Sequence, residues 1–128
     1  MTFKGPDGAL PPDYRLGEYR IQTVLGHGGF GITYLALDTK LNAQVAIKEY
    51  FPADLAGRDT QQFIAPRDTA NAKDYQWGLD KFLEEARALA RFKHNHIVRV
   101  LRFLETNGTA YMVMDYEEGE SLVHYLKR

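Results

Sequence analysis

A glycine-rich loop, Gly26-His27-Gly28-Gly29-Phe30-Gly31, precedes the segment Val45-Ala46-Ile47-Lys48 by a gap that fits one β-hairpin. The spacing Gly-x-Gly-x-x-Gly occurs in two unrelated nucleotide loops, and a glycine-rich turn without a ligand is at least as common. A dinucleotide-binding fold enters a helix after its last glycine, whereas here the β-branched residues Ile32 and Thr33 predict a strand. The loop is therefore predicted to be the tip of a hairpin, which disfavours a dinucleotide-binding oxidoreductase.

Alternating or β-rich segments on both sides of this loop predict an antiparallel sheet. Five segments are predicted to be strands: residues 19–25, 32–37, 43–50, 97–104 and 110–115. The last two are joined by Thr106-Asn107-Gly108-Thr109, a strong hairpin signal because Asn and Gly tolerate the positive φ of a type I′ turn. The first three are predicted to form a meander around the glycine loop.

One long helix is predicted between the third and fourth strands. Its apolar face is defined by residues that recur at three- and four-residue steps: Leu79, Phe82, Leu83, Ala86, Leu89 and Ala90. Asp74 or a neighbour is predicted to cap its start, and its end is expected near His94-Asn95. Residues 52–73, which precede the helix, carry Gly57 and Pro66 and are expected to be irregular.

Composition limits the class of protein. The chain has 128 residues, is 45% hydrophobic and carries a formal net charge of −1, which suits one packed core and gives no global field that would recruit nucleic acid. It contains no cysteine and no apolar run as long as a membrane span or a signal-peptide core. A cytoplasmic location is expected for this segment, and a membrane tether elsewhere in a longer chain is left open. His94-Asn95-His96 lacks a third ligand, so no metal site is predicted.

Lys48 follows three apolar residues on a strand that is predicted to be largely buried. Burial of an ammonium group is costly unless a counter-charge or a ligand phosphate satisfies it. The helix offers Glu84 and Glu85, of which only one can face the sheet because adjacent helical residues point about 100° apart. Its place on the apolar side favours Glu85, with Glu84 as the alternative. A solvated lysine on an edge strand and an ordinary surface carboxylate are the structural alternatives.

Taken in order, these segments resemble the N-terminal lobe of eukaryotic-like, bacterial-type Ser/Thr protein kinases. The resemblance covers nearly the whole chain and rests on five elements: residues 26–34, 45–48, 85–86, 94–98 and 111–116. No element is specific alone, but all five in this order are. The resemblance implies an α+β fold, with a five-stranded antiparallel sheet, one main helix (helix C) and an insert between the third strand and the helix. It divides the chain into a flexible leader (1–17), the lobe (18–116), and a hinge with the start of a connector helix (117–128).

The resemblance also implies a binding site for ATP. Lys48 would contact the α- and β-phosphates and pair with Glu85, the family's helix-C glutamate. The phosphates would lie under the loop residues Gly26, His27, Gly28, Gly29, Phe30 and Gly31, and Phe30 is expected to pack under this flap. Further contacts are implied for seven residues: Leu25, Thr33 and Ala46 over the adenine, Met114 as gatekeeper, backbone groups of Asp115 and Glu117 at the adenine edge, and Ser121 near the ribose.

Departures from the family pattern also carry information. Thr33 stands where valine is usual, and the insert over residues 49–77 is longer than expected, like those of bacterial members, which makes it a candidate for regulation or for docking a partner. The chain has no His-Arg-Asp catalytic loop and no Asp-Phe-Gly metal site, so the base and the Mg²⁺ ligands are expected in a C-terminal lobe.

These departures decide what the chain is expected to do. The intact enzyme is expected to act on a protein Ser or Thr hydroxyl, whereas the 128-residue chain alone is expected to be inactive. An isolated lobe is expected to self-associate, because the apolar floor of its cleft is exposed. The alternative is a stand-alone, non-catalytic lobe that binds a protein partner.

Overall fold

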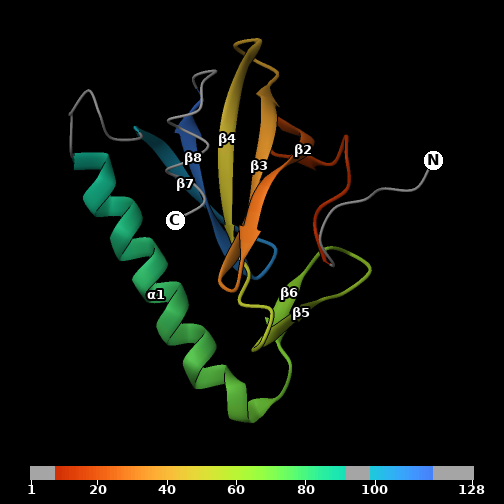
Figure 1. The fold of residues 1–128 in the computed structure, drawn as a ribbon, viewed down its shortest axis with the longest axis vertical. Helices are drawn as coiled ribbons and strands as arrows, with labels where there is room; N and C mark the ends of the chain where they lie inside the picture. The colour runs from red at the N-terminus through yellow and green to blue at the C-terminus, as the bar shows by residue number, and fades with distance from the viewer. Residues whose placement is uncertain (1–7, 92–98, 117–128) are drawn as a thin grey trace.

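The computed structural model describes residues 8–91 and 99–116, and its main feature is a curled antiparallel sheet (Figure 1). Six strands lie in the spatial order β1-β2-β3-β4-β8-β7. Their bounds are Arg15–Leu16 for β1, Tyr19–Gly28 for β2, Gly31–Asp38 for β3, Ala43–Tyr50 for β4, Thr109–Asp115 for β8 and Val100–Thr106 for β7. The predicted fold class is confirmed, with β1 as an additional two-residue edge strand.

The five predicted strands are all present, because local sequence fixes them strongly. The meander β2-β3-β4 pairs in sequence order, with Gly28 opposite Gly31 at the tip of the first hairpin. The hairpin between β7 and β8 turns at Asn107 and Gly108, whose φ angles of 55° and 73° are those of the predicted type I′ turn. The glycine loop is therefore a hairpin tip, as predicted.

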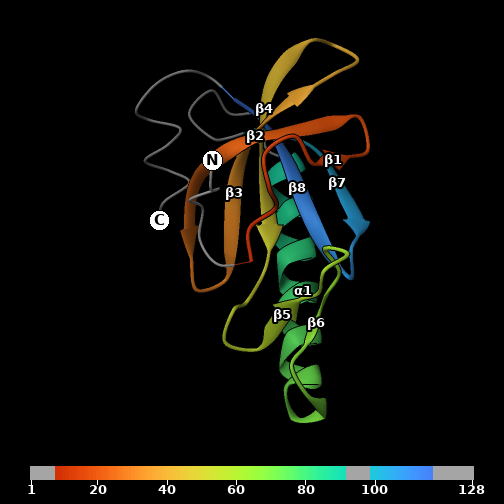
Figure 2. The same ribbon diagram turned by 90° about the vertical axis from the view of Figure 1, so that its right-hand side faces the viewer.

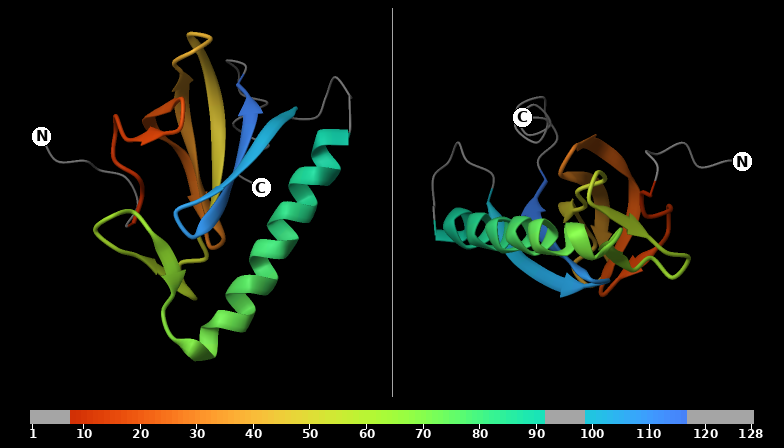
Figure 3. Two further views of the ribbon diagram at one scale, coloured as in Figure 1. Left: turned by 180° about the vertical axis from the view of Figure 1, so that it is seen from behind. Right: turned by 90° about the horizontal axis from the view of Figure 1, so that it is seen from below.

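Helix α1, Thr69–Arg91, packs beside the β7–β8 end of the sheet (Figures 2 and 3). It buries Tyr75, Phe82, Leu83 and Ala86. Three of the six residues of the predicted apolar face are thus buried, Leu79 and Leu89 are partly buried, and Ala90 is exposed. Its start differs from the prediction at Asp74, since the carboxylate of Asp68 accepts the N–H of Asn71 (3.0 Å) and caps the helix. The first turn carries no apolar stripe, so periodicity alone could not reveal it. The predicted end near residues 94–95 lies outside the described residues.

The insert before α1 contains a second, two-stranded sheet formed by β5, Ala56–Arg58, and β6, Ile64–Pro66. This hairpin lies beside the first half of the helix and below the main sheet in Figure 1. Its contact with the β7–β8 turn includes a bond from the N–H of Ile64 to the carbonyl of Asn107 (2.7 Å). The segment expected to be irregular is therefore partly ordered by tertiary contacts.

The segment before β2 is packed against the sheet from residue 8 onward, in contrast to the flexible leader expected over residues 1–17. Leu10 is fully buried, and its N–H donates to the hydroxyl of Tyr34 (3.0 Å). The N–H of Asp13 donates to the carbonyl of Ile21 (2.7 Å), and β1 pairs with β2. Single apolar residues among prolines and glycines produce no periodic pattern, so the sequence did not indicate this packing. Across the described residues, no helix is long and apolar enough to cross a membrane.

Candidate functional site

The two faces of the sheet differ in chemistry, and strand alternation assigns residues to each. Residues directly opposite one another in an antiparallel pair point to the same face, and successive residues of a strand point to opposite faces. Lys48 lies opposite Thr33 and Met112, and Ala46 lies opposite Met114. We call the side of the sheet that carries these five residues the front face. Four of the predicted nucleotide-site residues are therefore brought together on it.

The glycine loop stands at the end of this face and is held by the end of β4. The N–H of Phe51 donates to the carbonyl of Phe30 (3.0 Å). A Cβ added at Gly31 would collide with the carbonyl oxygen of Glu49, so the protein's own packing demands glycine there. A Cβ at Gly28 or Gly29 would meet no protein atom within 4 Å. Nothing in the described fold requires glycine at these two positions, whereas close approach of a ligand would.

Leu25 and Phe30, two further residues of the predicted nucleotide site, lie in positions that the sequence did not indicate. Leu25 lies at a register shift between Val24 and Gly26, where β2 has one residue more than β3. Such a bulge turns the strand locally and can redirect its side chains. Phe30 is 78% exposed, in contrast to the expected packing under the flap.

The predicted hinge is described only at its first residues. The N–H of Asp115 donates to the carbonyl of Arg99 (3.0 Å), so a backbone bond from Asp115 to a ligand would have to use its carbonyl oxygen. Met114, the predicted gatekeeper, is buried opposite Ala46. Glu117 and Ser121 lie outside the described residues, as does the segment 94–98 that contributed to the resemblance.

The structure does not bring Lys48 and Glu85 together. The described residues form three ion pairs, and none of them joins these two side chains. Glu85 is exposed, and the alternative Glu84 pairs with Lys81 (3.3 Å) on the outer surface of the helix. Lys48 is half-buried on the front face. The helix is anchored to the end of β4 through Tyr50, whose ring centroid lies 5.8 Å from that of Phe82.

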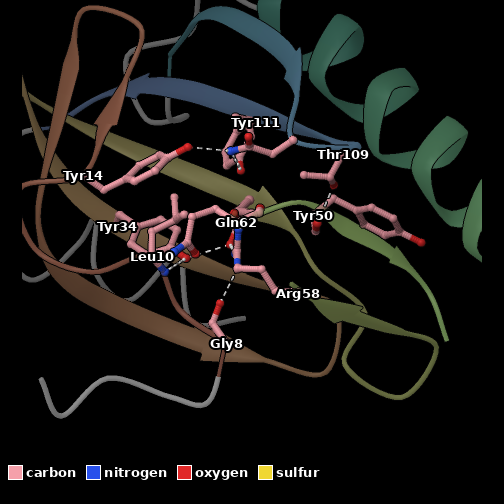
Figure 4. Close-up of polar contacts among 11 residues, drawn as sticks. Gly8, Leu10, Tyr14, Tyr34, Tyr50, Arg58, Gln62, Thr109 and Tyr111 are labelled. Atoms are coloured by element: carbon pink, nitrogen blue, oxygen red, sulfur yellow. Dashed lines mark hydrogen bonds and ion pairs between the residues drawn. The ribbon is translucent and has the colours of Figure 1, made fainter. Parts of the chain in front are cut away.

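A buried polar cluster lies on the opposite side, the back face, and the sequence reasoning missed it. Glu49 is fully buried, and its Oε1 accepts bonds from Nη2 of Arg58 (2.5 Å) and the hydroxyl of Tyr34 (2.7 Å). Figure 4 shows Arg58 reaching from the insert toward Tyr34 of β3. Arg58 also donates to two carbonyls, from Nε to Gly8 (2.6 Å) and from Nη1 to Gln62 (2.9 Å). We call these contacts the back-face cluster.

Burial and charge set the protonation states within this cluster. Tyr111 of β8 lies directly opposite Glu49. Burial, and then the negative charge of Glu49, raise the pKa of Tyr34 and of Tyr111 above the ordinary value. Burial lowers the pKa of Arg58, but the hydrogen bond and the charge of Glu49 outweigh this, so its pKa is raised. The two hydroxyls therefore stay protonated and the guanidinium stays charged. A signal was present in the sequence, because alternation along β4 places Glu49 on a face otherwise occupied by Val45 and Ile47.

The N-terminal lobe of a protein kinase is defined by three features that are all present here. They are a glycine hairpin, a strand-borne lysine on the face of the curled sheet at whose end this hairpin stands, and one helix after the third strand of the meander. Comparison with known proteins agrees. The Protein kinase domain family matches residues 19–128. The chain belongs to this family.

The most informative relatives are bacterial. Serine/threonine-protein kinase PrkC of Bacillus subtilis is 32% identical over 110 residues, which cover 86% of this chain and 14% of PrkC. Serine/threonine-protein kinase pkn2 of Myxococcus xanthus is 33% identical over 120 residues, covering 91% of this chain and 12% of pkn2. The solved structure of PpkA-294 in its apo form superposes with a TM-score of 0.86 at 47% identity, over 88% of this chain and 40% of that one. The chain thus spans a small part of the length of these curated relatives.

Proposed function

We propose that this chain is the ATP-binding lobe of a Ser/Thr protein kinase and positions ATP–Mg for transfer of phosphate to a protein Ser or Thr hydroxyl. The observation that carries the proposal is the gathering of Lys48, Thr33, Ala46 and Met114 on one face, next to the glycine hairpin. The serine/threonine kinase relatives support the choice of substrate class.

The residues on the front face fit a nucleoside triphosphate. Ala46 and Met114 lie opposite one another and give this face apolar side chains of the kind that pack on a planar base; both are buried in the structure, so a base has to displace the groups that cover them. Lys48 supplies a positive charge, and glycines at positions 28 and 29 let backbone N–H groups approach phosphate oxygens closely. When bound, ATP supplies the phosphoryl group. The residues of this chain bind and orient it, while the base and the Mg²⁺ ligands are assigned to a C-terminal lobe.

On this proposal, the ammonium group of Lys48 forms an ion pair with the carboxylate of Glu85 when the lobe has bound its nucleotide. Because the two side chains are not paired in the structure, α1 has to change its position relative to β4. The pair would hold the lysine extended toward the phosphates. Replacement of Glu85 by Gln should therefore lower phosphate transfer without lowering stability, because this carboxylate is exposed. Glu84→Gln is the matched control, and loss of transfer in that variant alone would move the assignment to Glu84.

The central test is phosphate transfer from labelled ATP to a protein acceptor by the intact protein that carries this chain. Lys48→Met should reduce the rate at least about 100-fold, since one charge that stabilises the phosphates is removed. Lys40→Met, in the exposed β3–β4 turn, should leave the rate unchanged. An intact protein that transfers no phosphate, or a Lys48→Met variant as active as the wild type, would favour the non-catalytic partner-binding module.

The 128-residue chain alone should transfer no phosphate, because it contains neither a His-Arg-Asp nor an Asp-Phe-Gly sequence. We further infer that the isolated lobe self-associates, since it exposes large apolar side chains such as that of Phe30, which is 78% exposed. Light scattering that shows a strict monomer at high concentration would contradict this second statement.

A further inference from the structure

We propose that Glu49 and Arg58 form a positioning pair, through which the insert fixes the end of β4 and so places both Lys48 and the glycine loop for nucleotide binding. The inference rests on the proposed function, which it deepens by assigning a role to the insert. Neither residue touches the front face, so both act through the backbone that they hold.

The first step is the adjacency of Glu49 to Lys48 on β4. The Glu49 carboxylate is fully buried and held by two donors, Nη2 of Arg58 and the hydroxyl of Tyr34. A backbone segment whose side chain is fixed in this way cannot shift or rotate without breaking both bonds. Lys48 directly precedes Glu49 on the strand, so the position of the Lys48 backbone is fixed as well.

The second step is that Arg58 is itself immobilised. Its guanidinium donates to the carbonyls of Gly8 and Gln62 as well as to Glu49, and its side chain is 4% exposed. The first carbonyl belongs to the segment before β1 and the second to the turn between β5 and β6. One planar group therefore joins the N-terminal segment, the insert and β4, which suits the fork geometry of arginine.

The third step connects this anchor to the glycine loop. Gly31 lies against the carbonyl of Glu49, and the N–H of Phe51 holds the carbonyl of Phe30 at 3.0 Å. Tyr34, the other donor to Glu49, belongs to β3, which leaves the loop. The carboxylate of Glu49 thus holds both β3, which begins at the glycine loop, and the end of β4, which contacts it. A change at the pair should be felt at the loop.

The energetics argue against a purely stabilising role. Removal of two charges from water is costly, and buried ion pairs can often be replaced by apolar side chains without loss of stability. The second oxygen of Glu49, Oε2, is buried and has no hydrogen-bond partner among the described residues, which adds to the cost. A group of apolar residues would fill this space at lower cost but would not fix β4, β3 and the insert in one register.

The test compares variants of the intact protein in steady-state phosphate transfer, with ATP as the varied substrate. Glu49→Gln and Arg58→Met should each lower kcat/KM for ATP by about tenfold or more, because small misplacements of reacting groups have effects of that size or larger. The loss should appear mainly in KM for ATP. The double variant should be little worse than either single variant, since both remove the same contact. Arg67→Met is the matched control, because Arg67 lies in the insert, its guanidinium donates to the carbonyl of Ala53 and not to Glu49, and its loss should leave KM unchanged.

A second readout does not require catalysis. Hydrogen exchange of peptides that cover residues 26–33 and 49–52, measured on the intact protein, should rise in Glu49→Gln and Arg58→Met more than exchange in β7 and β8 does. Tyr34→Phe removes one bond to Glu49 while keeping the ring, so it tests the same prediction in a variant that retains the core packing. A merely structural pair would raise exchange in all strands together.

The outcomes separate the two proposals. Wild-type protein that transfers no phosphate contradicts the proposed function, and the exchange pattern then still decides the positioning role. Active variants with unchanged KM for ATP and no local rise in exchange overturn the positioning pair while the proposed function stands. Variants with raised KM and locally raised exchange at the loop support it.

Discussion

Lys48 and Glu49 are neighbours on β4 and have opposite surroundings. Lys48 lies half-buried on the front face, opposite Thr33 and Met112, and forms none of the ion pairs present among the described residues. Glu49 is fully buried on the back face and is held by Arg58 and Tyr34. The charge of Lys48 is not paired among the described residues, whereas the charge of Glu49 is satisfied within the lobe.

The difference follows from what each face must do. Lys48 is half-buried, so its ammonium group keeps part of its hydration and can exchange it for phosphate oxygens. A fully buried carboxylate has lost its hydration and needs permanent donors. On the proposed function the front face binds the nucleotide, while the back face joins the insert and the N-terminal segment to the sheet. The predictions below test this division.

Loss of the buried charge should have the largest effect on stability. Glu49→Ala leaves the Arg58 guanidinium buried without its counter-ion, and breaking such a pair typically costs about 3–5 kcal/mol. Lys48→Ala removes a half-buried side chain without an ion pair and should cost less than about 1 kcal/mol. Chemical denaturation of both variants measures the two free energies of unfolding. Equal costs would contradict the division between the faces.

The N-terminal segment that covers the back face should contribute nearly as much to the free energy of unfolding as the buried ion pair does. Leu10→Ala removes a fully buried side chain and should lower the free energy of unfolding by about 2–5 kcal/mol. Pro12→Ala, in the same segment but exposed, is the control and should change it by less than about 0.5 kcal/mol. The measurement is again a denaturation curve. A negligible effect of Leu10→Ala would show that the segment does not hold the back face in solution.

Alkaline pH should weaken the back face through its tyrosines. The folded-state pKa of Tyr34 lies above its ordinary value of 10.0, so its contribution to stability is complete below pH 10 and is lost as the pH rises above it. The slope is about 1.4 kcal/mol per pH unit for each such group. Tyr50 lies outside the back face, against α1, and burial raises its pKa to about 12, so its own contribution to stability is lost between pH 10 and pH 12. Denaturation between pH 9 and pH 11.5 should show a shallower decline for Tyr34→Phe than for the wild type, and identical declines would contradict the assignment.

The front face could be predicted from the sequence because its signals are local. Ile32 and Thr33 after the loop, the Asn107-Gly108 turn and the apolar run before Lys48 each determine structure within a few residues. The back face depends on contacts between distant segments, such as Arg58 with Gly8, which are 50 residues apart. No short-range pattern encodes such a contact.

The position of Glu85 shows the same limit. Its spacing from Phe82 predicted that Glu85 faces the sheet, but the side chain is exposed, because sequence does not determine how the helix sits on the sheet. The pairing with Lys48 therefore remains a proposal, whereas the strand and the helix that carry the two residues are present as predicted.

The smallest effect on stability is expected at Gly28 in the glycine loop, three residues before Gly31, where the packing of the protein itself requires glycine. Gly28→Ala meets no protein atom and has no positive φ, so it should change the free energy of unfolding by less than about 0.5 kcal/mol. Gly31→Ala collides with the carbonyl of Glu49 and should destabilise by about 1–3 kcal/mol, the usual cost of overpacking. Nucleotide binding should fall in both variants, because a methyl group at position 28 would obstruct the approach of phosphates. If Gly28→Ala binds ATP as the wild type does, glycine at this position serves neither the fold nor the ligand, and the front face loses its phosphate site.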